Sequence, residues 1–253
     1  MSVGGPWEIM RTHDLTSDGR VIDLYTKSGD LGPYKGMLVL IPDFDVTFAI
    51  LMGGPDASSV AVTVGVGQLI EVLIPALDEV AKEEAQKNFA GTYMDEETSS
   101  TVILSLDDGP GLLVTELVMR DVDVLENYAS YTATQGGAPS TDKIEITPRL
   151  YSSGLRADNQ LGFRAMFNPG SVEDDNQLEE QLPFIPDVSC NAFFQLDRVN
   201  YGMNAMEDFV FSVGEDGCAD SLEARFWRVK LDRSEGDGSE QEGGSDGESE
   251  DSE

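Results

Sequence analysis

The sequence predicts an α+β unit of antiparallel strands closed by one long helix, followed by an all-β barrel of about eight strands. Two apolar hairpins in the first 53 residues predict the strands, and the long apolar stretch behind them has helical spacing. Most of the remaining chain consists of short β-rich segments separated by turn residues. The predicted organisation is a first unit at residues 1–88, a barrel at 89–231 and a disordered acidic tail at 232–253.

The first unit opens with two predicted hairpins. Residues 7–11 and 21–28 are rich in β-forming residues and flank the turn signal Thr16-Ser17-Asp18-Gly19. Residues 37–41 and 46–52 are nearly continuous apolar runs, which is typical of strands that are covered on both faces. These segments predict an antiparallel meander.

A helix is predicted to close this unit and to end near residue 88. Ser58 or Ser59 can cap its N-terminus, and Pro75 is expected to kink or restart it. Its most apolar part, residues 60–77, is interrupted by two glycines, Gln68, Glu71 and Pro75. This pattern predicts a buried helix and not a membrane span.

The barrel prediction depends on eight short β-rich segments with no helix between them. They are residues 89–94, 101–106, 112–119, 143–148, 161–167, 190–196, 208–213 and 224–230. Eight strands enclose an interior that side chains or one small ligand can fill. The last 20 residues, rich in Ser, Gly, Glu and Asp, cannot bury apolar area and are expected to be disordered.

The charge balance excludes several classes of partner. The chain has 48 acidic and 16 basic residues, a formal net charge of −32. Such a surface repels nucleic-acid phosphates and anionic membranes, so neither is an expected partner. The first residues have neither the basic nor the apolar region of a secretion signal, so the chain as written is expected to be cytoplasmic.

Cysteine and histidine are too few for a structural zinc site, and we expect no metal and no other cofactor. Cys190 and Cys218 can form one disulfide in an oxidising compartment or stay as two thiols in the cytosol. His13, beside a turn, is expected on the surface. The acidic runs at residues 95–97 and 173–175 do not have the spaced oxygen ligands of a calcium loop and are expected to be solvated loops.

The most informative motif is Lys27-Ser28-Gly29, followed by Asp30. This motif resembles the Lys-[Ser/Thr]-Gly triplet of serine penicillin-recognising enzymes, in which the ammonium and hydroxyl groups bind the substrate carboxylate and the glycine lets substrate lie along the strand edge. Trp7-Glu8-Ile9, the strand pair VLIPDFDVTFAILMGG and the run Phe89-Ala90-Gly91-Thr92-Tyr93 accompany it. With these segments the chain resembles the C-terminal part of a fungal class C β-lactamase-like, or penicillin-binding-protein-like, serine hydrolase.

The resemblance implies a fold, a chemistry and a set of residues. Proteins of this kind often carry an appended lipocalin-like β-barrel, and full-length members can be extracellular. They hydrolyse an amide, ester or lactam of a small molecule through an acyl-serine intermediate. By resemblance, Lys27, Ser28 and Gly29 bind substrate, and the backbone N–H of Asp30 is an oxyanion donor.

The chain departs from the family pattern at the catalytic motifs. Tyr-x-Asn does not occur in the sequence, and its one Ser-x-x-Lys, from Ser140 to Lys143, follows the triplet instead of preceding it. We interpret that match as coincidence and assign no catalytic residue, so this chain alone is expected to be inactive. Two alternatives stay open: a non-catalytic β-barrel that binds a ligand or partner, and an incomplete gene product without a separate role. The sequence leaves the oligomeric state open.

Overall fold

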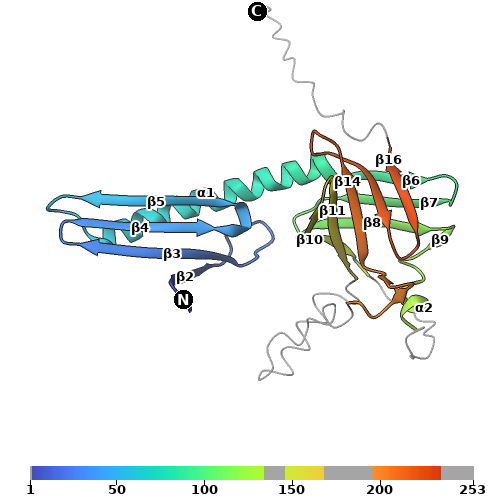
Figure 1. The fold of residues 1–253 in the computed structure, drawn as a ribbon, viewed down its shortest axis with the longest axis horizontal. Coiled ribbons are helices and arrows are strands. Elements are labelled where there is room, and N and C mark those ends of the chain that lie inside the picture. The colour runs from blue at the N-terminus through green and yellow to red at the C-terminus, as the bar shows by residue number, and fades with distance from the viewer. Residues whose placement is uncertain (1, 134–145, 168–195, 235–253) are drawn as a thin grey trace, which may run out of the picture. The chain divides into compact units, whose positions relative to one another are not determined.

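The computed structural model describes residues 2–133, 146–167 and 196–234, which belong to two compact units. The N-terminal unit comprises Met1–Ala85 and Leu106–Pro110. The C-terminal unit comprises Gln86–Ser105 and Gly111–Glu253. In Figure 1 the strands of the first unit are blue, and those of the second run from green to red.

The N-terminal unit is a five-stranded antiparallel meander with helix α1 along one face (Figure 1). Its elements, in order, are β1 (Ser2–Gly4), β2 (Trp7–Thr12), β3 (Ile22–Leu31), β4 (Tyr34–Ile41), the 3-10 turn η1 (Pro42–Phe44), β5 (Val46–Gly53) and α1 (Ser59–Phe89). The two predicted hairpins are present. β3 pairs with β2 only up to the Thr26↔Glu8 pair, whereas it pairs with β4 as far as Leu31↔Tyr34. The last five residues of β3 therefore extend past its last residue pair with β2.

Helix α1 forms where the sequence predicts it. The Ser58 hydroxyl accepts a hydrogen bond from the N–H of Ala61 at 3.0 Å, which caps the helix N-terminus. Pro75 lies inside α1 without ending it. The helix buries one stripe with four-residue spacing, namely Val62, Val66, Ile70, Ile74 and Asp78. This stripe packs on a sheet face formed by Ile22, Leu24, Met37, Val39 and Ile41.

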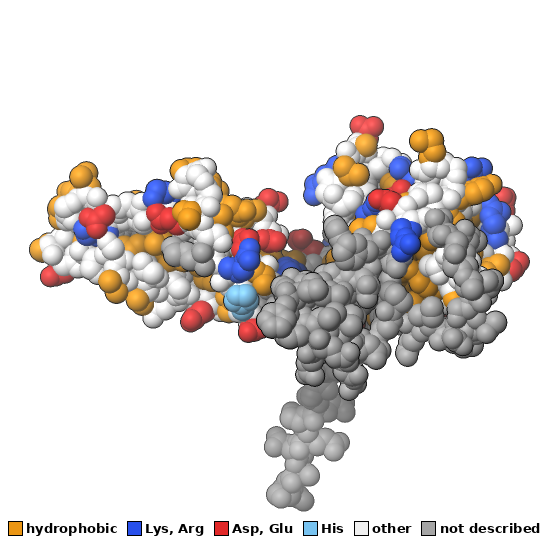
Figure 2. Space-filling model, turned by 90° about the horizontal axis from the view of Figure 1, so that it is seen from below, with side chains coloured by type: hydrophobic (Ala, Val, Ile, Leu, Met, Phe, Trp, Pro, Cys, Tyr) orange, Lys and Arg blue, Asp and Glu red, His pale blue; other side chains and the backbone are white. Residues whose placement is uncertain are grey.

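The prediction that the apolar strands are covered on both faces is wrong for the described residues. Along β5, exposed residues alternate with partly buried ones, and Leu51 is 82% exposed. The outer side of α1 is also apolar, with Val60 and Val72 at 73% and 70% exposure. Figure 2 shows hydrophobic side chains at the surface of this unit. A continuous apolar run predicts a strand that is covered on both faces, but in this unit α1 covers only one face of the sheet.

By length and composition alone α1 could also cross a bilayer, a test that the core helix of a globular domain can pass as well. Only 22% of its most apolar stretch is buried. The segment is a helix as predicted, but it buries one stripe and not its whole circumference. The absence of a membrane partner stays a prediction.

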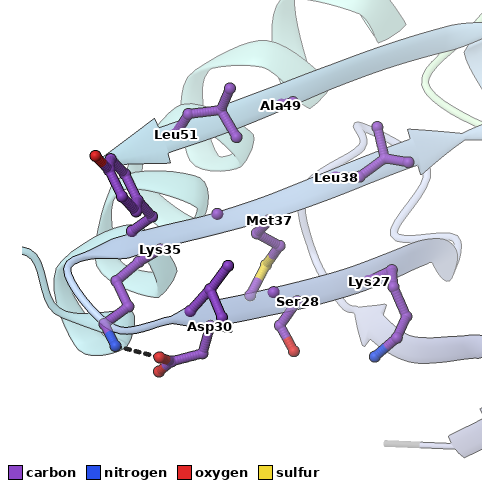
Figure 3. Close-up of a pocket in the computed structure, with 12 residues that line it drawn as sticks. Lys27, Ser28, Asp30, Lys35, Met37, Leu38, Ala49 and Leu51 are labelled. Atoms are coloured by element: carbon purple, nitrogen blue, oxygen red, sulfur yellow. Dashed lines mark hydrogen bonds and ion pairs between the residues drawn. The ribbon is translucent and has the colours of Figure 1, made fainter. Parts of the chain in front are cut away.

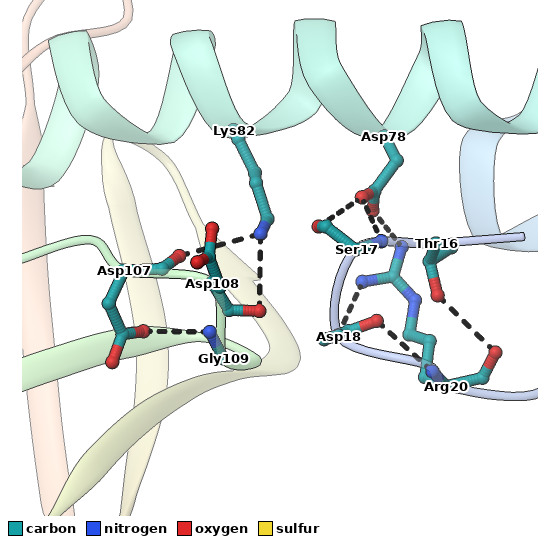
Figure 4. A network of polar contacts seen from close by, with 9 residues as sticks. All are labelled: Thr16, Ser17, Asp18, Arg20, Asp78, Lys82, Asp107, Asp108 and Gly109. Atoms are coloured by element: carbon teal, nitrogen blue, oxygen red, sulfur yellow. Dashed lines mark hydrogen bonds and ion pairs between the residues drawn. The ribbon is translucent and has the colours of Figure 1, made fainter. Parts of the chain in front are cut away.

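A polar network ties the turn between β2 and β3 to α1 (Figure 4). Asp78, 3% exposed, accepts hydrogen bonds from the backbone N–H and the hydroxyl of Ser17 at 3.1 and 2.7 Å. The guanidinium of Arg20 lies 3.3 Å from the other Asp78 oxygen. One turn further along α1, Lys82 donates to two backbone carbonyls in the loop Leu106–Pro110.

The C-terminal unit is built on a nine-stranded antiparallel sheet with the order β10-β11-β14-β15-β16-β6-β7-β8-β9. Strand β8 also pairs with β10, through Leu112↔Leu150 and Leu113↔Arg149. The elements are β6 (Gly91–Asp95), β7 (Ser100–Ser105), β8 (Leu112–Met119), β9 (Val122–Asp123), α2 (Tyr128–Ala133), β10 (Arg149–Ala157), β11 (Gln160–Met166), β12 (Asn200–Tyr201), β13 (Asn204–Ala205), β14 (Asp208–Val213), β15 (Ala219–Ala224) and β16 (Val229–Arg233). β12 and β13 pair only with each other.

Aromatic rings dominate the packing of this unit. Phe211 contacts Phe163, Phe89 and Tyr93, with ring centroids 4.9, 5.1 and 5.7 Å apart. Phe89 is the last residue of α1. The guanidinium of Arg233 donates to backbone carbonyls around that helix end, including that of Lys87 at 3.0 Å. Helix carbonyls that have no partner within the helix are thereby satisfied.

Several strand predictions in this unit need correction. Residues 143–145 of the segment predicted at 143–148 lie outside the described residues, and its described residues 146–148 precede β10, which begins at Arg149. The segment predicted at 224–230 spans a turn: β15 ends at Ala224 and β16 begins at Val229. Helix α2 interrupts a region that was predicted to have no helix. The predicted strand at 190–196 and the acidic tail lie almost wholly outside the described residues.

Candidate functional site

An open groove of about 440 Å3 lies at the part of β3 that extends past β2 (Figure 3). All residues of the predicted motif line it: Lys27, Ser28, Gly29 and Asp30. The other lining residues come from β4, β5 and the end of β3: Leu31, Tyr34, Lys35, Gly36, Met37, Leu38, Ala49 and Leu51. The groove therefore lies entirely within the N-terminal unit.

Two glycines leave the space that forms the floor of the groove. Gly29 and Gly36 are direct cross-strand partners, so neither strand has a side chain at this pair. Leu51 faces Gly36 from β5, and a Cβ on Gly36 would lie 2.7 Å from a Leu51 methyl group. A Cβ on Gly29 would meet no atom within 4 Å. The space beside Gly29 is thus open to a bound molecule.

The Lys27 and Ser28 side chains both contact one carboxylate, that of Glu8 on β2. The Lys27 ammonium donates to Oε1 of Glu8 at 2.5 Å, and the Ser28 hydroxyl donates to Oε2 at 2.9 Å. The backbone N–H of Ser28 donates weakly to the same Oε2 at 3.4 Å. These donors hold the pKa of the Glu8 carboxyl below its usual value, with the Lys27 hydrogen bond as the largest cause.

The direction of the Ser28 backbone N–H also indicates the direction in which the Asp30 backbone N–H points. Ser28 donates toward Glu8, on the outer side of β3. Backbone N–H groups alternate in direction along a strand, so the N–H of Asp30 points to the same outer side. There β2 no longer accompanies β3.

The Asp30 carboxylate is held by two other groups at the far end of the groove. It forms an ion pair with Lys35, its cross-strand partner, and accepts a hydrogen bond from the hydroxyl of Ser59 at 2.9 Å. The hydrogen bond from Lys35 is the larger cause of a lowered Asp30 pKa. Both lysines among the lining residues therefore already pair with a carboxylate.

The remaining predicted candidates do not join this site. Ser140, Lys143, Cys190 and the acidic run at 173–175 lie outside the described residues. The Cys218 sulfur lies 3.6 Å from the side-chain oxygen of Asn88 and is bonded to no cysteine in the described part of the chain, and its pairing with Cys190 stays a prediction. His13 is exposed. Within the described parts of the chain, no three His, Cys, Asp or Glu side chains are grouped to hold a metal ion.

Sequence reasoning missed Glu8 as a member of the site. Arg11, the basic residue nearest to Glu8 in the sequence, forms a two-bond contact with Asp23, the shorter bond being 2.8 Å. The hairpin register places Glu8 opposite Thr26, next to the triplet. A search for an acidic residue on β2 within one position of the triplet in the hairpin register would have found it.

Comparison with known proteins supports the family resemblance. A family model described as "Beta-lactamase-like-like, C-terminal domain" matches residues 81–235. The chain is 29% identical over 166 residues to the probable hydrolase clz13 of Cochliobolus lunatus, covering 63% of this chain and 27% of that protein. It is 25% identical over 236 residues to a beta-lactamase-like protein of Arthroderma benhamiae, covering 85% of this chain and 38% of that protein.

Two further matches complete this comparison. The probable hydrolase M10 of a Phoma species is 27% identical over 158 residues, which cover 61% of this chain and 26% of that protein. The chain thus spans between about a quarter and two fifths of the length of these relatives. The octameric penicillin-binding protein homologue from Pyrococcus abyssi is 14% identical to this chain, and the match covers 89% of this chain and 38% of the homologue's chain. Its TM-score of 0.25 is too low to show a shared fold. Because the family model matches more than half of the sequence, this chain belongs to the family of β-lactamase-like C-terminal domains.

Proposed function

We propose that this chain supplies the substrate-binding strand and the C-terminal domain of a serine hydrolase that cleaves amides, esters or lactams through an acyl-serine intermediate. The family match and the relatives named as hydrolases support hydrolase chemistry in general. The observation that carries the finer proposal is the outer edge of β3 past Thr26, which pairs with no strand in the described part of the chain. There the Lys27-Ser28-Gly29 triplet lines an open groove beyond the last residue pair with β2.

Each residue of this strand has a role that its position supports. Gly29 lets substrate lie close to the backbone, because no described atom lies within 4 Å of the place its Cβ would take. Ser28 presents a hydroxyl and a backbone N–H on the outer edge. The N–H of Asp30, directed to the same edge, would donate to the oxyanion that develops when an ester or amide carbonyl is attacked.

The nucleophile and its base are not assigned to residues of this chain. The order of motifs in the sequence makes Ser140 an unsuitable nucleophile, and Tyr-x-Asn does not occur. A serine acts as nucleophile only when a base lies within hydrogen-bond reach of its hydroxyl. We therefore expect the 253-residue chain alone to form no covalent adduct with a fluorophosphonate. A labelled serine, located by peptide mapping, would contradict this.

For the C-terminal unit we propose a closed, lipocalin-like barrel. The β8–β10 pairing supports closure, because it returns the order of eight strands to its start. A separate ligand-carrying function has less support, because Phe89, Tyr93, Phe163 and Phe211 pack against one another within this unit. We favour a structural domain appended to the hydrolase.

Ligand binding by the full chain tests the substrate-binding role of β3. Methyl 4-phenylbutyrate, an uncharged ester, is titrated into 15N-labelled protein, and we expect the amide signals of residues 27–30 to shift. Gly29→Val fills the open space above the groove floor and should abolish the shifts. Gly67→Val, which adds the same side chain to the exposed surface of α1, should leave them unchanged. Shifts that persist in Gly29→Val, or are absent in the unmodified chain, would refute the role.

A further inference from the structure

The groove is electrically neutral although two lysines are among its lining residues. Lys27 forms an ion pair with Glu8, and Lys35 forms one with Asp30. Among the lining residues these are the only cations, and Asp30 is the only anion. With Glu8 at the edge, the local charges cancel. An incoming anion thus finds no unpaired ammonium group in the groove.

The Glu8 carboxylate lies where a substrate carboxylate would have to bind. A carboxylate bound to a Lys-Ser-Gly triplet uses the lysine ammonium and the hydroxyl. Here both groups already donate to Glu8, at 2.5 and 2.9 Å. A second carboxylate would have to displace Glu8 or lie beside it, and two like charges at contact repel strongly.

The backbone holds Glu8 in this position. Glu8 is a paired residue of β2, and its carbonyl accepts a hydrogen bond from the buried Thr26 hydroxyl at 2.7 Å. Its side chain is itself 26% exposed, so it is partly enclosed by its neighbours. The paired backbone and the bonds from Lys27 and Ser28 therefore place the carboxylate beside the groove.

The rest of the groove favours an apolar ligand. Leu31 and Leu51 are 78% and 82% exposed there, and Tyr34 and Leu38 are exposed beside them. Burying such side chains under a ligand is favourable in proportion to the apolar area removed from water. The net charge of −32 adds a long-range field that lowers the local concentration of anions.

We propose that Glu8 is a specificity-determining residue, which makes this groove select uncharged acyl compounds such as esters and reject those with a carboxylate near the scissile group. The inference rests on the proposed function, because it concerns the substrate class of the same groove. Glu8 takes the place of the substrate carboxylate at Lys27 and Ser28. Specificity here comes from a repulsive group as well as from apolar contacts.

A matched pair of ligands tests this with the full chain. Methyl 4-phenylbutyrate and 4-phenylbutyrate share every apolar atom except the ester methyl and differ in charge. We expect the ester to bind at least about tenfold more tightly, as measured by amide shifts of residues 27–30. In Glu8→Gln, which keeps the shape of the side chain but removes its charge, the acid should gain about tenfold and the preference should disappear.

The control is Glu79→Gln, which removes the same charge from an exposed position on α1 and should keep the ester preference. Dispersed spectra of each variant show that it is folded. If the acid binds the unmodified chain as tightly as the ester, or if Glu8→Gln leaves the preference intact, the specificity role of Glu8 is wrong while the groove remains a ligand site. If neither compound shifts residues 27–30 in any variant, the proposed function fails, and the inference fails with it.

Discussion

At the scale of single residues, Asp78 and Glu207 are two buried acidic residues whose carboxylates differ in what they contact. Asp78 accepts two hydrogen bonds from Ser17 and lies 3.3 Å from the Arg20 guanidinium. Glu207 is 4% exposed, and its Oε2 has no hydrogen-bond partner among the residues that the structure describes. A buried charge stabilises a fold only when it is paired, so substitution of these two residues should have opposite effects.

Asp78→Asn should lower the free energy of unfolding by about 2 kcal/mol, because charge-assisted hydrogen bonds become neutral ones and the contact with Arg20 loses its charge. Chemical denaturation at neutral pH measures this. Glu79→Gln, on the same helix but exposed, should change the free energy by less than about 0.5 kcal/mol. Equal effects of the two substitutions would show that the network in Figure 4 contributes nothing to stability.

Glu207→Gln should stabilise the protein at pH 7.5 and have little effect near pH 4. Burial is the largest cause that raises the Glu207 pKa above its ordinary value of 4.5. Above pH 4.5 the folded chain therefore holds a proton that the unfolded chain has lost, and the free energy of unfolding falls as the pH rises through the raised pKa. Gln carries no charge at any pH, so the free energy of unfolding of the variant does not fall for this reason.

Thermal unfolding across this pH range checks the Glu207 prediction. Glu215→Gln, an exposed position in the same unit, is the matched control and should show no such pH-dependent gain. A Glu207→Gln variant that is less stable than the unmodified protein at pH 7.5 would mean that the carboxylate has hydrogen-bond or ionic partners in solution.

At the scale of elements, the pairing of β8 with β10 depends on a close approach at Gly111. Its φ is +69°, and a Cβ there would lie 2.6 Å from the backbone oxygen of Leu150 in β10. Gly217 also has a positive φ, +83°, but a Cβ there would meet no atom within 4 Å. A substitution at either glycine therefore strains the backbone, but only a substitution at Gly111 also causes a steric overlap.

Gly217→Ala should lower the free energy of unfolding by about 1 kcal/mol, the cost of a left-handed conformation for a residue with a Cβ. Gly111→Ala should cost at least about twice as much, because β8 and β10 must also move apart. Chemical denaturation compares the two, and hydrogen exchange at Leu113 and Leu150 reports on the strand pair. Equal losses of free energy in the two variants would show that β10 can shift to accommodate a methyl group at no cost in stability.

At the scale of the whole molecule, the two units differ in how completely their apolar surfaces are covered. The N-terminal unit has exposed apolar residues on its open sheet face and on the outer side of α1, as Leu51 and Val60 illustrate. In the C-terminal unit the large aromatic residues Tyr93, Phe209 and Phe211 are at most 2% exposed. Extensive exposed apolar area leads to association.

A fragment of residues 86–234 should therefore fold alone, whereas residues 1–88 should aggregate. Thermal unfolding and NMR dispersion of the two separate fragments test this. We expect a cooperative transition and dispersed signals for the first fragment and neither for the second. A soluble 1–88 fragment with dispersed signals would show that α1 covers enough of its sheet for independent stability.

Local patterns determined much of this protein. Apolar runs fixed the strands of the N-terminal unit, Ser58 marked the start of α1, and the triplet at Lys27 located the groove. Alternation, capping and turn formation are short-range effects, so neighbouring residues suffice to predict them. In the C-terminal unit the same reasoning found β8 and β14 with their observed bounds. It misplaced β10 and merged parts of β15 and β16, because weakly apolar strands carry little periodic signal.

Only the tertiary structure decided which groups meet across the strands. Glu8 and Lys27 are 19 residues apart, and their contact depends on the register of the β2–β3 hairpin. The same holds for Ser17 and Asp78, which are 61 residues apart and meet because α1 packs over the sheet. The sequence alone determined that a Lys-Ser-Gly strand is present. The fold decided that its cation is already paired, because the position of a charge depends on register and packing, which no local pattern encodes.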